Sequence, residues 1–370
     1  MAVSCCPDPV AAAASAAPAG GHSFSAAAGP LPPEVVDEVA EACRSWRGGA
    51  PVLSLPFTSE AFRELQHETE ARLRRLLGIP QGYRVLFMQG GASAQFALVP
   101  LNLLGPDDAA AHLDTGHWSR RAAVEAARHA RVVSLHHDDL DPSAPSPDTA
   151  PVAYLHLTSN ETADGWQWPR LPASPWPLVV DMSSDLLTRE IHWTGLGLLY
   201  ASAQKALGVP GLTLVIVRDD LLGHARPSVP GVMNYTALAA ADSRLNTPPV
   251  FAVFVAHAML GWIERQGGVP AMAHTAARRS EAVYQALDAS GGVYRPGVDP
   301  AWRSRINPCF GLAEPALTPR FLEQARAAGL FDLQGHPDLG GLRVSLYNGT
   351  PEAAVCALLC FLRAFQRSHG

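Results

Sequence analysis

One lysine stands alone in a chain that otherwise uses arginine for its cations. The 370 residues contain 28 lysines and arginines together, and only Lys205 is a lysine. A guanidinium stays protonated, whereas a desolvated ε-amine can lose its proton and form a Schiff base with a carbonyl compound. A solvated surface lysine is the common alternative, because lysines are rarely buried. The retained lysine nevertheless indicates amine chemistry at Lys205.

Polar residues follow several apolar runs that have the length and composition of buried strands. Such continuous runs, separated by helical patterns, predict an α/β fold with a largely parallel sheet covered on both faces. Ligands of these sheets bind where the strands end. The predicted strands are 85–88, 152–157, 178–180, 198–201 and 212–217, and the polar residues expected together are Ser93, Trp118, Thr162, Asp181 and Lys205.

The turn Gly90-Gly91-Ala92-Ser93 lies between a predicted strand and a helix. Small residues let the backbone approach a phosphate, and the helix start favours the anion. A tight connection without a ligand explains the turn equally well. Together with a lysine, a carboxylate and a tryptophan, however, it matches the needs of pyridoxal 5′-phosphate. The cofactor requires an aldehyde partner, a countercharge for its pyridine nitrogen, a phosphate site and a stacking ring.

Composition limits the other possibilities. The net charge is −6 with both signs scattered, which favours neither nucleic acid nor an anionic membrane as partner. No apolar run is long enough to span a bilayer, and residues 1–22 lack the basic start of a signal or transit peptide. We therefore expect a cytoplasmic protein. The six cysteines lack the spacing of a zinc site or a disulfide framework.

The length favours two domains. We expect a disordered tail over 1–22, a large cofactor-binding domain over 23–266 and a small domain over 267–370, with the boundary at two glycines. Helices are predicted from residue 33, over 60–77 and over 119–128, and an extended piece over 52–55. No metal site is expected, because no Cys, Asp or Glu has ligand spacing to the histidines. Solvated loop positions are expected for His112, His117, His136 and His137.

Seven segments in order resemble the phosphoserine aminotransferases, class V enzymes with the type I pyridoxal-phosphate fold. The resemblance runs from about residue 31 to 367 and implies a seven-stranded, mostly parallel sheet in the large domain. The segments are 85–96, Ser159-Asn160-Glu161-Thr162, Asp181-Met182-Ser183-Ser184, Ala203-Gln204-Lys205, Gly211-Leu212-Thr213, Asn246-Thr247-Pro248-Pro249 and Gly340-Gly341-Leu342-Arg343.

The resemblance implies a role for each matching residue. Lys205 binds the cofactor aldehyde, Asp181 pairs with the pyridine nitrogen, and Trp118 stacks on the ring. Arg343 binds the substrate α-carboxylate. A homodimer with its active sites at the interface is also implied. The phosphate is held by Ala92, Ser93 and Gln204 and, from the neighbouring subunit, by Asn246 and Thr247, while Thr162 meets the ring hydroxyl side.

Departures from the family concern the substrate side chain. The family holds a phosphate or a distal carboxylate with two His-Arg pairs. Phe57 and Thr58 stand at the first pair, and His336 and Pro337 at the second. Each charge-assisted hydrogen bond is worth roughly 1.5–3 kcal/mol, so three lost partners cost about 4–9 kcal/mol.

Three interpretations stay open. The chain is an aminotransferase for uncharged side chains, or a phosphoserine aminotransferase with anchors moved to residues such as Arg63 or His67, or an enzyme for elimination or racemisation on the same scaffold. A cofactor-binding protein without catalysis is disfavoured, because Lys205, Asp181 and Arg343 are all retained.

Overall fold

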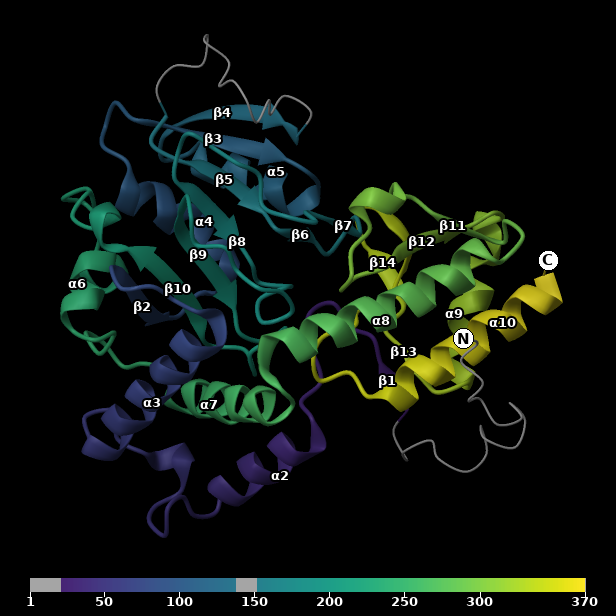
Figure 1. The fold of residues 1–370 in the computed structure, drawn as a ribbon, viewed down its shortest axis with the longest axis horizontal. Helices are drawn as coiled ribbons and strands as arrows, with labels where there is room; N and C mark the ends of the chain where they lie inside the picture. The colour runs from purple at the N-terminus through teal and green to yellow at the C-terminus, as the bar shows by residue number, and fades with distance from the viewer. Residues whose placement is uncertain (1–20, 138–151, 370) are drawn as a thin grey trace.

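The computed structural model describes residues 21–137 and 152–369, so residues 1–20 of the predicted tail lie outside it. The described chain forms a large domain around a seven-stranded sheet and a smaller domain around a four-stranded sheet (Figure 1). His22 and Ser23 form a strand, β1, that pairs with β13 (Leu330–Phe331) of the small domain. His22, which the prediction included in a disordered tail, therefore lies in a strand.

The large sheet has the strand order β2-β10-β9-β8-β5-β3-β4. Only β10 runs against the others, because it pairs antiparallel with both β2 and β9 while the remaining neighbours are parallel. The predicted mostly parallel seven-stranded sheet is confirmed. Its strands are β2 (Tyr83–Met88), β3 (Ala109–Asp114), β4 (Arg131–His136), β5 (Leu155–Thr158), β8 (Leu178–Asp181), β9 (Leu196–Ser202) and β10 (Thr213–Arg218).

Helices cover both faces of this sheet, which explains why its central strands β5, β8 and β9 are buried along their whole length. In β2, Val85 and Phe87 join one core, whereas Leu86 and Met88 join the other. The first core is closed by α2 (Pro33–Ala42), α3 (Glu60–Leu77) and α7 (Val250–Arg265), and the second by α4 (Gly91–Leu103), α5 (His117–Ala126) and α6 (Tyr235–Ala240).

Helix α3 illustrates how local sequence sets the element bounds. Ser59 caps its start by accepting a hydrogen bond from the Phe62 amide, and Gly78 ends it in the left-handed conformation. The predicted bounds of 60–77 are confirmed. The extended piece predicted over 52–55 is wrong, because Val52–Ser54 form a 3-10 helix, η1, after Pro51, whose φ of −56° suits a helix start.

The small domain has an antiparallel sheet in the order β11-β12-β15-β14, and Phe24 packs in its core. Helix α8 links the domains, since Val269 and Met272 pack in the large core and Val283 and Leu287 in the small one. The elements are α8 (Gly268–Asp288), β11 (Tyr294–Pro296), β12 (Cys309–Leu312), α9 (Thr318–Ala327), β14 (Gln334–His336), β15 (Gly340–Arg343) and α10 (Glu352–His369).

Short elements complete the described chain. The hairpin of β6 and β7 extends from the end of β5 toward the small domain, where Trp166 bridges Arg303. These elements are β6 (Asn160–Glu161), β7 (Trp166–Gln167) and the 3-10 helices η3 (Asp219–Leu221), η4 (Gly231–Met233), η5 (Pro300–Trp302) and η6 (Pro315–Leu317).

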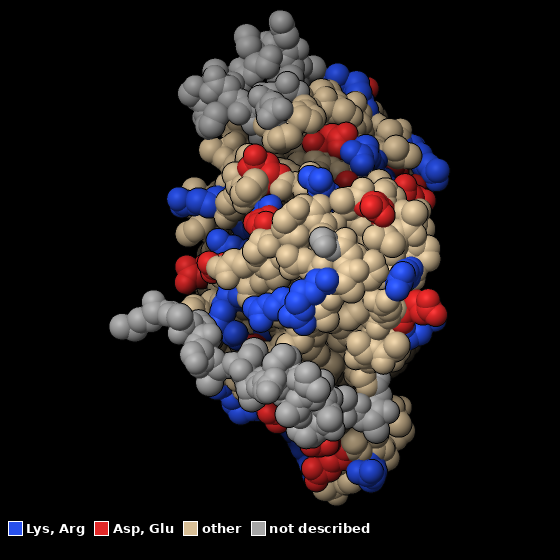
Figure 2. Space-filling view, turned by 90° about the vertical axis from the view of Figure 1, so that its right-hand side faces the viewer, with Lys and Arg blue, Asp and Glu red and all other residues tan. Residues whose placement is uncertain are grey.

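Charges of both signs are interspersed over the face of the small domain (Figure 2). This distribution agrees with the scattered charges of the sequence. Among the described residues, no helix combines the length and apolar character required to cross a bilayer.

Candidate active site

A cavity of about 410 Å³ lies at the carboxyl ends of the parallel strands, between the two domains. This is the edge of the sheet at which the sequence predicts a bound ligand. Most of the predicted site residues line it: Ala92, Ser93, Trp118, Thr162, Asp181, Gln204, Lys205, His336 and Arg343.

Four predicted site residues do not line this cavity. Asn246 and Thr247 are exposed, and so is Thr58. The Phe57 ring is half-buried and packs against the core of the large domain. Within one chain, the cavity is therefore built without these four residues.

Lys205 follows β9, and Asp181 ends β8, so neighbouring strands bring the amine and the carboxylate to one cavity. Burial lowers the pKa of Lys205 below its ordinary value, an effect that Asp181 partly opposes and Arg343 adds to. Burial likewise raises the pKa of Asp181, while hydrogen bonds from Ser183 oppose the rise. The Ser183 amide donates to Asp181 Oδ1 at 2.9 Å. A lowered amine pKa favours the neutral, nucleophilic form.

Trp118 forms one wall of the cavity. Its indole Nε1 donates to Thr162 Oγ1 at 2.8 Å, and Lys205 Nζ lies 5.7 Å from the centre of its ring. The hydrogen bond fixes the ring plane relative to β6. A flat ligand bonded to Lys205 would therefore meet an oriented aromatic surface.

Glu161 holds the backbone of Trp118 in position, although the sequence alone indicated no role for it. Its buried carboxylate accepts the backbone N–H groups of Trp118 and Ser119, at 2.8 and 2.9 Å, at the start of α5. Burial raises the pKa of Glu161 to about 7, against these hydrogen bonds. The sequence signal available for this role was the position of Glu161 directly before Thr162 in the segment Ser159-Asn160-Glu161-Thr162.

The glycine turn before α4 has the geometry of an anion site. Gly90 and Gly91 have φ values of 100° and 71°, and a Cβ on Gly90 would lie 2.7 Å from the Ala94 Cβ. On the other side of the turn, Ser202 Oγ donates to Gln204 Oε1 at 2.5 Å. That bond leaves the Gln204 amide nitrogen as a donor for a ligand.

Two buried polar atoms at the cavity have no partner among the described residues: Thr158 Oγ1 and Arg343 Nε. Arg343 is held in place through Nη1, which donates to the Thr162 carbonyl at 2.9 Å. Buried polar groups are rarely left unpaired, so these atoms indicate that a ligand with acceptor atoms belongs here. The amine of Lys205, the carboxylate of Asp181 and the glycine turn before α4 fit pyridoxal 5′-phosphate.

Asn160 ties the cavity floor to the small domain. Its amide nitrogen donates to Ser184 Oγ and Asn307 Oδ1, both at 2.8 Å, and Ser304 Oγ donates to its oxygen at 2.5 Å. All four side chains are buried. This network sets the position of the small domain relative to the strand ends.

The expectation of solvated loop histidines is wrong for His112. It is buried on β3 and stacks on His156 with ring centres 4.5 Å apart, and burial lowers its pKa to about 3. The expectation is wrong in part for His136, which is exposed but ends strand β4 and does not lie in a loop. His117 begins α5 beside His336 of the small domain, a neighbour that sequence spacing did not reveal.

The sequence and the fold agree on one family. The Aminotransferase class-V family matches residues 22–358. The phosphoserine aminotransferase of Chromobacterium violaceum is 41% identical over 358 residues, covering 94% of this chain and 99% of the relative. That of Acidithiobacillus ferrooxidans is 42% identical over 359 residues, covering 94% and 98%. The chain belongs to the phosphoserine aminotransferase family of class-V aminotransferases.

Solved structures of class-V aminotransferases support the fold and the cofactor. The phosphoserine aminotransferase from Bacillus circulans subsp. alkalophilus has a TM-score of 0.88 at 36% identity, covering 94% of this chain and 98% of its own. The pyridoxal-phosphate-bound enzyme from Trichomonas vaginalis has a TM-score of 0.86 at 33% identity, covering 93% and 99%. The chain is a pyridoxal-phosphate-dependent transaminase with the type I fold, as its sequence predicted.

Proposed function

We propose that this class-V aminotransferase moves amino groups between α-amino acids and α-keto acids whose side chains carry no phosphate. The observation that carries the proposal is the loss of basic residues at the family's side-chain clamp. Phe57, Thr58 and Pro337 stand where His, Arg and Arg are expected from the resemblance. Of the four clamp positions, only His336 could meet a phosphate dianion, since the other three carry no positive charge.

The retained residues assign the chemical steps. Pyridoxal 5′-phosphate, when bound, supplies an electron sink for bond breaking at the substrate α-carbon. Lys205 would hold the aldehyde and then move the α-proton as a general base and acid. Asp181 would keep the pyridine nitrogen protonated, and Trp118 would cover the ring. Arg343 would orient the substrate through its α-carboxylate.

The main alternative is a phosphoserine:2-oxoglutarate aminotransferase of serine biosynthesis with relocated anchors. The two candidate anchors are engaged elsewhere in the chain. Arg63 forms an ion pair with Glu60 on α3, and His67 Nε2 lies 3.8 Å from Asp242 Oδ2. Like Phe57 and Thr58, neither residue lines the cavity of its own chain, so the preference rests on these two ion pairs. These contacts favour the reading with an uncharged substrate.

We further propose a homodimer in which Asn246 and Thr247 complete the neighbouring cavity. Both are exposed in the single chain, on a loop that Gln66 of α3 joins by donating to the Asp242 carbonyl at 2.6 Å. Leu245 beside them is 43% exposed, so an interface at this loop would also bury an apolar side chain. Phe57 and Thr58 would reach a substrate only across that interface.

A substrate profile tests the function. We expect kcat/KM for amino acids with apolar or neutral polar side chains to exceed that for phosphoserine by at least about tenfold, the value of one charge-assisted hydrogen bond. A preference for phosphoserine would support the relocated-anchor alternative. Product formation without any keto-acid acceptor would instead support elimination or racemisation.

A further inference from the structure

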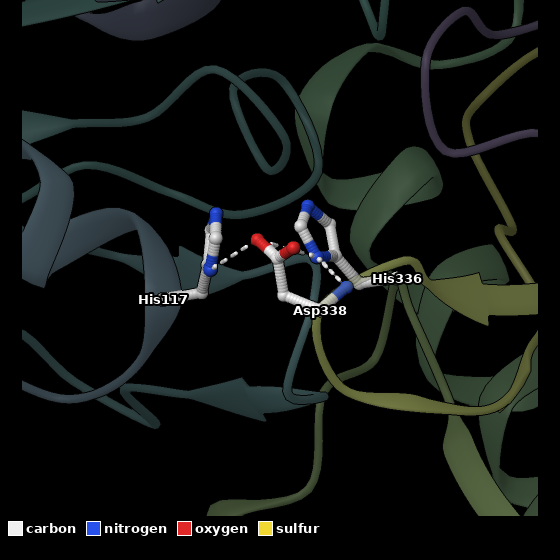
Figure 3. A group of neighbouring side chains, drawn as sticks. All are labelled: His117, His336 and Asp338. Carbon is white, nitrogen blue, oxygen red and sulfur yellow. Dashed lines mark hydrogen bonds and ion pairs between the residues drawn. The ribbon is translucent and has the colours of Figure 1, made fainter.

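Two histidines and an aspartate from different domains meet at the edge of the cofactor cavity (Figure 3). His117 begins α5 in the large domain. His336 ends β14 in the small domain, and Asp338 lies in the turn that leads to β15. The carboxylate lies between the two imidazole rings, and His336 also lines the cavity.

The distances are close to those around a single ion. Asp338 Oδ2 lies 3.9 Å from His117 Nδ1 and 3.7 Å from His336 Nδ1, and the two ring centres are 4.1 Å apart. The candidate ligand atoms of the three residues all lie within 4.8 Å of one another. Zn²⁺ binds nitrogen and oxygen ligands at about 2.0–2.2 Å, so two ligands of a tetrahedral ion lie about 3.3–3.6 Å apart.

Both distances to Asp338 exceed this separation by at most about 0.6 Å. The widest separation, which is no more than 4.8 Å, would close by up to about 1.5 Å on metal binding. His336 Nδ1 also accepts the Asp338 backbone N–H at 3.3 Å, a bond that the ion would replace. The side chain of Asp338 is 70% exposed and free to adjust, and a slight approach of the two domains would shorten the histidine distance. His117 Nε2 has no hydrogen-bond partner among the described residues, so no second bond fixes that ring.

The set of ligand atoms identifies the class of ion. Two imidazoles and a carboxylate suit Zn²⁺ and its transition-metal neighbours, whereas Mg²⁺ and Ca²⁺ prefer oxygen ligands. Other histidine–carboxylate pairs in the described part of the chain, such as His67 with Asp242, lack a second histidine. Within the described residues, only His117, His336 and Asp338 form a group of three candidate ligands.

We propose that His117, His336 and Asp338 form a binding site for a divalent transition-metal ion, best matched by Zn²⁺, which bridges the two domains at the edge of the cavity. Three protein ligands leave a fourth position for water. The ion would hold the turn of the small domain against α5, close to Trp118, whose ring centre is 6.2 Å from that of His336. The alternative is a docking contact that binds no metal.

Cobalt(II) titration of the holoenzyme tests this site, with reductant present to keep cysteines as thiols. After dialysis against a chelator, we expect one equivalent of Co²⁺ per chain to produce ligand-field absorption at wavelengths beyond the cofactor bands. Zn²⁺ should displace it. Asp338→Asn and His117→Asn should each weaken binding about tenfold or more, as losing a ligand removes a metal bond.

Asp242→Asn is the matched control, because it removes an exposed carboxylate from a pair with a single histidine. That variant should bind Co²⁺ as the wild type does. Cofactor absorbance and thermal unfolding confirm that each variant is folded. The proposal is overturned if the wild type shows no ligand-field absorption, or if Asp338→Asn and His117→Asn bind Co²⁺ with unchanged affinity.

Discussion

The two sides of the cavity differ in how firmly the fold holds them. On the cofactor side, Asp181 and Thr162 are buried at strand ends, and hydrogen bonds fix Trp118 and Ser183 around them. On the substrate side, His336 lies beside a turn in which the Asp338 side chain is 70% exposed. Residues of the first kind follow from the sheet itself, whereas turns tolerate substitution.

The difference teaches where reaction type and substrate choice are encoded. The residues retained at the strand ends explain why the chain is a transaminase of a known family. The proposed change of substrate rests entirely on positions outside the sheet, at residues 57, 58 and 337. A fold can thus keep its cofactor chemistry while its loops select another substrate.

The largest effect is expected for Lys205, the centre of the cofactor side. Lys205→Ala should lower the transamination rate at least about 10³-fold, because general acid–base catalysis at this position is lost. Lys205→Arg should be equally inactive, since a guanidinium stays protonated. Steady-state rates test this, and borohydride reduction followed by peptide mapping should label Lys205 in the wild type. A Lys205→Ala protein with wild-type turnover would contradict the assignment.

Asp181 should rank next. Asp181→Asn keeps the shape of the side chain but removes the buried countercharge, and breaking a buried charge pair costs about 3–5 kcal/mol. We expect turnover to fall about 10²- to 10³-fold, while the cofactor remains bound by its absorbance. Unchanged turnover would remove Asp181 from the catalytic set.

Mixed dimers test whether a second chain contributes residues to each active site. Lys205→Ala and the Asn246→Ala, Thr247→Ala double variant should each be inactive alone. After subunit exchange, half of the dimers carry both chains and one intact site, so about one quarter of wild-type activity should return. A fully active monomer in light scattering would rule out the shared site.

The smallest effect concerns stability on the cofactor side. Burial raises the pKa of Glu161 to about 7 from 4.5, so the folded state binds this proton more tightly than the unfolded state. The resulting stabilisation is complete below pH 4.5 and is lost as the pH rises through 7. Glu161→Gln cannot titrate.

Denaturant unfolding at a series of pH values measures this effect. The stability of wild type relative to Glu161→Gln should fall by up to about 3 kcal/mol across that interval. If the free energy of unfolding of the two proteins changes with pH in parallel, burial does not raise the pKa of Glu161.

Sequence reasoning succeeded where chemistry and periodicity coincide. Strand ends carry Asp181 and Lys205 to one edge because parallel strands end together, and the helix predicted over 60–77 ends at Gly78 as expected. Periodicity could not reveal contacts between distant segments. The pairing of β1 with β13 and the meeting of His117 with Asp338 depend on how two domains pack. The buried position of His112 was missed because no strand was predicted over 109–114, so His112 was assigned to a solvated loop.

The selectivity of the native enzyme, compared with a variant that restores the basic residues, tests the central claim most directly. The variant is Phe57→His, Thr58→Arg, Pro337→Arg, and its matched control places the same charges at exposed neighbours, as Leu53→His, Ser54→Arg, Leu339→Arg. The measured quantity is kcat/KM for phosphoserine divided by kcat/KM for a neutral amino acid. We predict a ratio below one in the native enzyme and the control, and a rise of at least about tenfold in the restored variant. A native ratio above one that the restored residues do not increase would contradict the account.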